Sequence, residues 1–588
     1  MRDDADEAPS PAVLPPAGPV VPAGPAGHAL SWAARHWWAT LALLCIVLWT
    51  PGILSLPPID RDESRFAESS RQMLESGNFV DIRFGHVPRY KKPAGIYWLQ
   101  SATTAIAGLG DRSHIWTYRL ASLLGGILAV LLCFWCARAF ASAEVAWGAA
   151  ALLATSLLLT AESTMATTDA CQLAAVMGAM GVLLRVYLAA RDTTRAAVPT
   201  RTVLLGWAAF AAGVLIKGPV VPGVCAVTIL ALLAWERGDW RWLKTTRPLY
   251  GVPLALLIVL PWAVAILVAS HGEFYEQSLG QDFAAKIAGG QESHGAPPGY
   301  YLLLVTLTFW PAILFVVPGL GAALRRLADP ATRFLLAWAG ASWLMFEAVP
   351  TKLPNYVLPA YPPLAMLAAL WLFWPRDASE RRWQPVLFYL AAVQFAVGAA
   401  ALAAAPILAT RSYGSGTTWW LVGLAALGAA LGAIALIAHL RRARLFAFTA
   451  AALSALVFYP TLTAGAAPRL DAIWISPRAA ALIAKYQRPG DPPPALAGYT
   501  EPSMMFLLGS ETRLTDGRSA AEIGGYQGGL ALIEDHERAA FLAHIAELET
   551  DAAPLARLDG LNYTRGAKVH MTLYRVTATH DVTVPPAE

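Results

Sequence analysis

Long apolar runs, separated by short polar connections, constrain this chain more than any other feature. An α-helix needs about 20 apolar residues to cross the hydrocarbon core of a bilayer. Only 14% of the 588 residues are charged and 56% are hydrophobic, whereas soluble domains carry about 25% charged residues. The sequence therefore predicts an α-helical polytopic membrane protein. Its thirteen expected spans lie near 38–56, 119–139, 144–161, 170–190, 202–216, 219–235, 250–270, 299–319, 333–349, 355–374, 386–408, 418–439 and 444–462.

Positive charges are distributed unequally between the two sides of these spans. Alternate connections contain clusters of Arg and Lys, such as Arg237, Arg241, Lys244 and Arg247, and the opposite short connections hold few. Because positively charged loops stay in the cytoplasm, the Arg-rich side is predicted to be cytoplasmic. An odd number of spans then places the N-terminus in the cytoplasm and the C-terminus outside.

The chain divides into three parts by composition. Residues 1–30 are rich in Pro, Ala and Gly without apolar periodicity, which predicts a disordered cytoplasmic tail. Residues 31–462 form the membrane domain, with two long outside loops at 57–118 and 271–298. Residues 463–588 contain turn clusters and short polar and apolar segments, and predict a small α/β domain outside the membrane.

Local patterns within these loops predict individual elements. The stretch from Ser64 to Leu74 is an amphipathic helix that we expect to lie in the membrane interface, with Gly77 at its C-cap. In the C-terminal domain, Met504–Leu508 and Met571–Val576 resemble strands, and Glu534–Leu548 resembles an amphipathic helix.

Several classes of function are disfavoured by what the sequence contains. The net charge of +4 is small and argues weakly against a nucleic-acid partner. All five cysteines lie in apolar runs, so no disulfide framework is implied. Charge within the spans is sparse, which counts against an ion-coupled transporter.

Six polar blocks gather on the predicted outer face, which fits a shared cavity better than six unrelated turns. They are Asp60–Glu68, Pro88–Pro93, Glu162–Asp169, Lys217–Pro219, Gly290–Tyr301 with the preceding Lys286, and Pro350–Tyr356.

Each block has a functional and a structural interpretation. The first carboxylates could include a general base or be solvated, and Lys91 and Lys92 could clamp a phosphate or contact lipid headgroups. Asp169 could cap a helix as readily as act in a site, and His294 could be functional or pack a loop. Lys217, between two apolar half-spans, is a functional candidate by default because an intramembrane charge is costly.

The ordered blocks resemble a known family. Asp62-Glu63-Ser64-Arg65-Phe66-Ala67-Glu68 is similar to the first periplasmic loop of the aminoarabinose lipid A transferases. These belong to the protein O-mannosyltransferase-like membrane glycosyltransferases of the GT-C fold. Lys92-Pro93, Lys217-Gly218-Pro219 and Thr351–Tyr356 extend the resemblance, which covers roughly residues 38–480.

The resemblance implies a glycosyltransferase that takes a sugar from a polyprenyl (undecaprenyl-type) phosphate donor. The acceptor would be lipid A, lipopolysaccharide or another glycan at the periplasmic face of the bacterial inner membrane. By carry-over, Asp62 would be the catalytic carboxylate and Lys92 would bind the carrier phosphate. Asp169 and Lys217 would line the cavity, with Tyr356 at its rim.

Neighbouring residues complete the candidate site. Glu63 and Asp169 join Asp62 as possible catalytic carboxylates. Possible donor-binding or cavity residues are Arg65, Lys91, Lys286, Tyr90, His294 and Lys352.

One position departs from the family. The aminoarabinose transferases have Glu-Lys-Pro where this chain has Lys91-Lys92-Pro93, and the Glu there helps to hold a divalent metal. Metal dependence is therefore in doubt, and no cofactor is assigned. The second lysine would add positive charge near a phosphate or an anionic sugar, so that an acidic donor sugar such as galacturonic acid is a minority hypothesis.

Two alternatives stay open. A protein O-mannosyltransferase-like enzyme would need the same base and phosphate clamp, with protein hydroxyls as acceptors. A flippase of lipid-linked sugars would need paired broken helices in inverted repeats, and the sequence shows one clear break, at Lys217. For a transferase, a single displacement would invert the anomeric centre.

Overall fold

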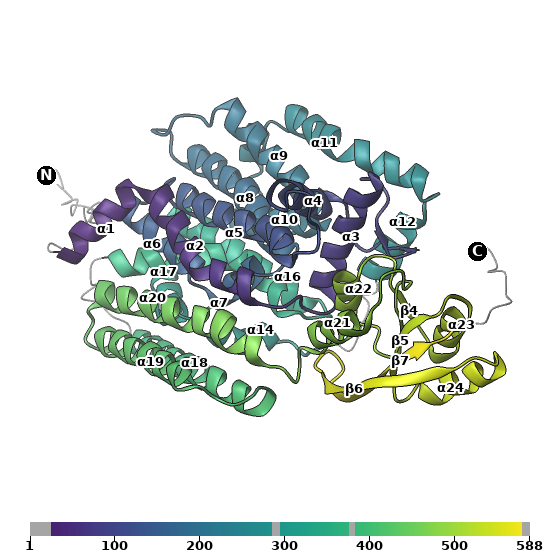
Figure 1. The fold of residues 1–588 in the computed structure, drawn as a ribbon. Helices are drawn as coiled ribbons and strands as arrows, with labels where there is room; N and C mark the ends of the chain where they lie inside the picture. The colour runs from purple at the N-terminus through teal and green to yellow at the C-terminus, as the bar shows by residue number, and fades with distance from the viewer. Residues whose placement is uncertain (1–24, 285–294, 375–382, 579–588) are drawn as a thin grey trace, which may run out of the picture.

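The structure is a computed structural model of the 588-residue chain, and it describes residues 25–284, 295–374 and 383–578. These residues form a bundle of helices with a smaller α/β domain at one end (Figure 1). Helix α1 (Pro25–Arg35) lies at the other end. Residues 25–30 are therefore helical and not part of a disordered tail, because Leu30 and Ala34, one turn apart, are both buried against the bundle.

Nine helical segments among the described residues are long and apolar enough to cross a membrane, and the pair α6 and α7, bent by 66°, makes a tenth if it counts as one span. The nine are α2 (Trp37–Ser55), α5 (Ile115–Ala137), α8 (Asp169–Arg191), α9 (Thr200–Lys217), α11 (Pro248–Ala269), η3 with α17 (Pro354–Phe373), α18 (Gln384–Tyr413), α19 (Trp419–Leu440), and α20 with η4 and η5 (Arg444–Arg469). The bent pair is α6 (Ala143–Ala154) and α7 (Leu157–Ser163).

The three other predicted spans are helical but shorter, interrupted or less apolar. They are α10 (Val220–Trp235), the pair α14 (Tyr300–Thr308) and α15 (Ile313–Ala323), and α16 (Pro330–Ala348). Pro311 lies between α14 and α15, where the lack of a backbone N–H interrupts a helix. The helical membrane bundle is thus as predicted, and among the described residues the number of full-length spans is smaller than thirteen by the criterion of length and apolarity.

The break predicted at Lys217 is present. Helix α9 ends at Lys217 and α10 begins at Val220. Gly218, between them, has φ +65° and ψ −123°, a backbone conformation that only glycine adopts without strain.

The first long loop contains α3 (Asp62–Ser76), a short hairpin of β1 (Arg83–Phe84) and β2 (Val87–Pro88), and α4 (Gly95–Ala107). Helix α3 ends at Gly77 with φ +71°, as predicted. Nine of its 15 residues are buried, because α3 contacts α4 on one side and α22 of the C-terminal domain on another. These two neighbours, α4 and α22, cover much of the surface of the helix, and its expected position in the membrane interface stays a prediction.

The second long loop follows α11 and begins with α12 (Glu273–Tyr275) and the π-helical turn η2 (Glu276–Phe283). A short helix, η1 (Arg241–Thr246), precedes α11. Two predicted site residues, Lys286 and His294, lie outside the described residues.

The C-terminal domain is a five-stranded sheet covered by helices on both faces. The strand order is β4 (Arg513–Thr515), β3 (Ala495–Ala497), β5 (Gly529–Glu534), β7 (Ala567–Val576) and β6 (Ala552–Asn562). Strand β3 is parallel to both neighbours, and β7 is antiparallel to both of its own. The helices are α21 (Ile475–Tyr486), α22 (Pro502–Leu508), α23 (Gly517–Gln527) and α24 (Arg538–Glu547).

Side chains alternate between the two faces of this sheet with the period of two that strands impose. Leu496 and Leu532 pack with Ile483 of α21, whereas Ile533 packs on the other face with Phe541 of α24. The predicted helix and the strand at Met571–Val576 are confirmed in α24 and β7. Residues 504–508 form helix α22 instead of a strand, since Pro502 occupies a first-turn position where proline favours a helix.

Candidate functional site

A cavity of about 670 Å³ lies among the membrane helices, within the size range of small-molecule sites. Helices α8 to α11 and α16 contribute to its wall, as do η3, α12, η2 and the residues that precede α4. Most of the lining side chains are apolar. The charged ones among the described residues are Lys91, Lys92, Asp169, Lys217 and Asp282.

The structure brings together five residues that the sequence singled out. Lys91, Lys92, Asp169, Lys217 and Tyr356 all line this cavity. They come from the first long loop, α8, α9 and η3, so that residues up to 265 positions apart share one site.

Two ion pairs cross the cavity lining. The Lys217 Nζ atom lies 2.6 Å from an Asp169 carboxylate oxygen and 5.5 Å from the centre of the Tyr356 ring. The Lys92 Nζ atom lies 3.2 Å from a carboxylate oxygen of Asp282 on η2. With Lys91, the lining carries three positive and two negative charges. Its net charge of one positive unit favours the binding of one anionic group.

Asp62 lies outside this lining, at the first position of α3, where its side chain is 66% exposed. An Arg89 guanidinium nitrogen lies 3.9 Å from its carboxylate. Asp62 nevertheless belongs to the same charged neighbourhood, because Asp62, Asp169 and Lys217 all interact electrostatically with the carboxyl group of Glu162 on α7.

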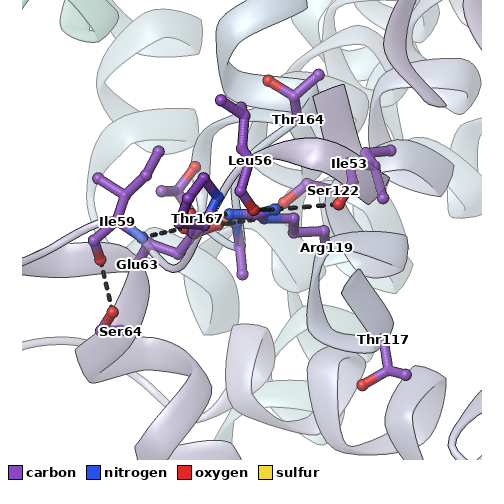
Figure 2. Close-up of polar contacts among 12 residues, drawn as sticks. Ile53, Leu56, Ile59, Glu63, Ser64, Thr117, Arg119, Ser122, Thr164 and Thr167 are labelled. Carbon is purple, nitrogen blue, oxygen red and sulfur yellow. Dashed lines mark hydrogen bonds and ion pairs between the residues drawn. The ribbon is translucent and has the colours of Figure 1, made fainter. Parts of the chain in front are cut away.

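Glu63, next to Asp62, forms a buried ion pair with Arg119 of α5 (Figure 2). Two Arg119 nitrogens each donate to one Glu63 oxygen, both at 2.8 Å. The remaining Arg119 donors bind the carbonyl oxygens of Ile53, Leu56 and Pro57 at 2.7–3.0 Å.

The same carboxylate also accepts two backbone N–H groups. One Glu63 oxygen binds the N–H of Ile59 at 2.9 Å and the other that of Ala166 at 2.7 Å. All five Arg119 donors and four carboxylate acceptor positions are therefore used. This network joins the end of α2, the loop before Asp62, α5 and the turn before Asp169, which gives Glu63 a structural place in the fold.

Three other predicted residues lie outside the cavity lining. Lys352 is buried, and its ammonium group donates to the carbonyls of Glu347 and Val349 at 2.8 and 2.7 Å, which caps the C-terminus of α16. The hydroxyl of buried Tyr90 donates to Asp81 at 2.8 Å, and burial raises its pKa. Arg65 is half-buried on α3.

Sequence reasoning missed three polar residues of the lining, Gln172, Ser278 and Asp282. Gln172 lies three residues after Asp169 on α8, so the helical period placed both on one face and could have revealed it. Asp282 lies 190 positions from its partner Lys92, and no local pattern connects them.

A divalent metal has little support from the donor set. No three His, Cys, Asp or Glu side chains come together as a metal site within residues 25–284, 295–374 and 383–578. Lys91 adds an ammonium group, which cannot bind a cation, to the lining. The described residues thus do not fit a metal, and the chemistry below uses none.

The C-terminal domain contacts the loop that carries Asp62. The Tyr563 hydroxyl accepts the backbone N–H of Asp60 at 2.7 Å, and Arg61 donates to the carbonyl of Thr564 at 2.9 Å. Asp60 also accepts a hydrogen bond from Ser503, and burial raises the pKa of Asp60 to about 6.

A second contact lies further along α3. Arg71 donates to the carbonyls of Phe506 and Met505 at 2.8 and 3.2 Å and lies 2.6 Å from buried Glu68. Burial raises the pKa of Glu68 to about 7, and the positive charge of Arg71 offsets this in part.

Comparison with known proteins agrees with this geometry. Residues 58–272 match the family model described as dolichyl-phosphate-mannose-protein mannosyltransferase. The undecaprenyl phosphate-alpha-4-amino-4-deoxy-L-arabinose arabinosyl transferase of Edwardsiella ictaluri is 32% identical over 346 residues. That alignment covers 56% of this chain and 58% of the relative, so the chain spans little more than half the length of the curated relatives it matches.

Solved structures extend the likeness to nearly the whole fold. ArnT from Cupriavidus metallidurans in the apo state has a TM-score of 0.69 at 19% identity, over 92% of this chain and 98% of that one. The same protein bound to undecaprenyl phosphate has a TM-score of 0.68 at 21% identity, with the same coverage. The chain therefore has the GT-C fold that the resemblance implied, and about half of it is similar in sequence to the aminoarabinose transferases.

Proposed function

We propose that this protein is a membrane glycosyltransferase that uses a sugar linked to a polyprenyl phosphate of the undecaprenyl type. The acceptor we propose is lipid A, lipopolysaccharide or another glycan at the periplasmic face of the bacterial inner membrane. In this orientation the N-terminus is cytoplasmic, and the C-terminal domain is periplasmic, as the distribution of Arg between the loops indicates.

The observation that carries the proposal is the composition of the cavity wall. Apolar side chains of α9, α10 and α11 form much of it, and Lys91, Lys92 and Lys217 provide its positive charge. A polyprenyl phosphate has the matching chemistry, with a hydrocarbon chain and an anionic head. The structural relative that was solved with undecaprenyl phosphate supports this assignment.

The reaction needs two groups from the protein. Lysine ammonium groups stabilise the negative charge that grows on the departing phosphate as the bond from the sugar carbon to the phosphate oxygen breaks. A carboxylate takes the proton of the attacking acceptor hydroxyl, a role we assign to Asp62. Its exposed side chain at the start of α3 is accessible to an acceptor, and a single displacement inverts the anomeric centre.

The donor phosphate must compete with carboxylates already present. Lys92 is paired with Asp282 and Lys217 with Asp169, so binding of a phosphate exchanges one anionic partner for another. The net positive charge of the lining favours this exchange. The two ion pairs also keep the lysine side chains oriented before the donor binds, which lowers the entropic cost of assembling the site.

The match to the protein mannosyltransferase model makes protein hydroxyl groups the second candidate acceptor. A flippase of lipid-linked sugars, the other alternative, would move the lipid without forming a glycosidic bond.

Transfer by purified protein tests the proposal. Undecaprenyl phosphate carrying radiolabelled aminoarabinose or galacturonic acid is incubated with lipid A, lipopolysaccharide or unfolded periplasmic protein. Lys92→Ala should raise the KM for the donor at least tenfold, because it removes a charge-assisted contact with the phosphate. Lys485→Ala, in the C-terminal domain, is the matched control. Movement of the lipid across liposomes without transfer would instead establish the flippase.

A further inference from the structure

Gln172 is a buried polar side chain that lines the cavity without a partner. It is 2% exposed, and neither its amide nitrogen nor its amide oxygen has a hydrogen-bond partner among the described residues. Burial of an unpaired amide is costly, since both groups lose their hydrogen bonds to water. Gln100 provides the contrast within the same chain.

Gln100 is completely buried, and both ends of its amide are paired. Its oxygen accepts from Ser70 at 2.8 Å and its nitrogen donates to the carbonyl of Ala166 at 3.0 Å. A buried glutamine in this protein can thus be fully satisfied by its surroundings. Gln172 differs in that its amide is unpaired although the residue lines the cavity, one helical turn from Asp169, which pairs with Lys217.

The chemistry of the unpaired amide restricts what can bind it. A phosphodiester monoanion has acceptor oxygens only and would satisfy the N–H₂ group but not the oxygen. An alkyl chain would satisfy neither. A sugar hydroxyl both donates and accepts, so two hydroxyls of one ring pair with both ends of the amide.

We infer that Gln172 binds hydroxyl groups of the donor sugar, and so contributes to donor specificity in the proposed transferase. This inference rests on the proposed function and adds to it. Lys92 and Lys217 would bind the phosphate, and Gln172 would bind the sugar. Removing the amide should therefore affect binding of the glycosylated lipid and spare binding of undecaprenyl phosphate.

Gln172→Met tests the inference with two readouts of opposite sign. Methionine has a similar volume and no group that needs a hydrogen bond, so the variant without ligand should melt about 1–4 °C above wild type. Gln100→Met, which breaks two existing hydrogen bonds, should melt below wild type. A structural role for Gln172 would lower the melting temperature of both variants.

Binding in detergent gives the second readout. The Kd of Gln172→Met should rise about tenfold for undecaprenyl phosphate that carries the transferred sugar. The Kd for undecaprenyl phosphate alone should stay within about twofold of wild type. Equal weakening for both lipids, or for neither, would overturn the inference. Failure of the proposed function is a different result, in which wild type itself transfers no sugar from any donor.

Discussion

The buried pair of Glu63 and Arg119 allows one prediction to be worked in detail. In Glu63→Gln, an amide N–H₂ replaces one carboxylate oxygen, so a donor faces Arg119 and a backbone N–H where an acceptor stood. Arg119, which is 0% exposed, also loses its counter-charge. Breaking one side of a buried ion pair costs about 3–5 kcal/mol, and the fully used donors and acceptors here place Glu63→Gln at about 4 kcal/mol.

The assay is a double-mutant cycle of unfolding free energies in detergent, followed by tryptophan fluorescence. Arg119→Met alone should cost a similar amount, since it leaves three carbonyl oxygens without their donors and deprives the buried Glu63 carboxylate of its counter-charge and of two of its four hydrogen bonds. The double variant should be at least 2 kcal/mol more stable than the sum of the single losses predicts, because two interacting partners are removed together. Asp192→Asn, in the exposed pair with Arg195, is the control and should cost less than about 1 kcal/mol. The reasoning is refuted if Glu63→Gln is as stable as wild type, or if the single losses simply add.

Two further predictions concern two buried carboxyl groups near the C-terminal domain and the metal dependence of transfer. Burial raises the pKa of Asp60 to about 6 and of Glu68 to about 7, above their values of 3.8 and 4.5 in the unfolded chain, so the folded state holds more protons between about pH 4 and 7. Stability should therefore fall as pH rises through this window, by up to about 3 kcal/mol for each group. The charge of Glu501 adds to the rise in the pKa of Asp60, whereas the charge of Arg71 lessens the rise in the pKa of Glu68 without reversing it. The free energy of unfolding measured at pH 5 and at pH 7.5 tests this prediction. The double variant Asp60→Asn with Glu68→Gln should have the same stability at both pH values. A wild type that is more stable at pH 7.5 than at pH 5 would contradict the prediction. EDTA should leave transfer unchanged, because Lys91 brings positive charge to the lining and no three metal-ligating side chains come together among the described residues; loss of transfer that added Zn²⁺ restores would count against this.

Much of the membrane domain could be predicted from the sequence because its causes are local. A run of apolar residues forms a helix wherever a bilayer surrounds it, and each of the thirteen predicted runs is helical. The break after Lys217 was visible for the same reason, since Gly218 and Pro219 are adjacent in the chain. The full-length spans were overcounted where a proline divides a run, as between α14 and α15.

The site was predicted in composition but not in its pairings. The polar blocks identified Lys92, Asp169 and Lys217, whereas the contact of Lys92 with Asp282 joins residues 190 positions apart. Glu63 looked catalytic because it stands beside Asp62. Its true partner, Arg119, is a single charge at the start of an apolar run, and nothing near it in the sequence indicates the pairing.

Docking of the C-terminal domain was the least predictable feature. Asp60 and Tyr563 are 503 positions apart, and α3 is covered in part by α22 of the same domain. Amphipathic spacing alone could not distinguish a helix covered by lipid from one covered by a folded domain. The assignment of α22 failed because Met and Leu suit a helix as well as a strand, and Pro502 at its start decided the outcome.

The central claim is that Asp62 accepts the proton of the acceptor in a sugar transfer from a polyprenyl phosphate. Single-turnover transfer by Asp62→Asn, beside wild type and with donor saturating, tests it most directly. The variant keeps the size of the side chain and removes its basicity, so the rate of transfer should fall about 10²–10⁴-fold while the Kd for the donor stays within about twofold. Transfer by Asp62→Asn at the wild-type rate would contradict the account.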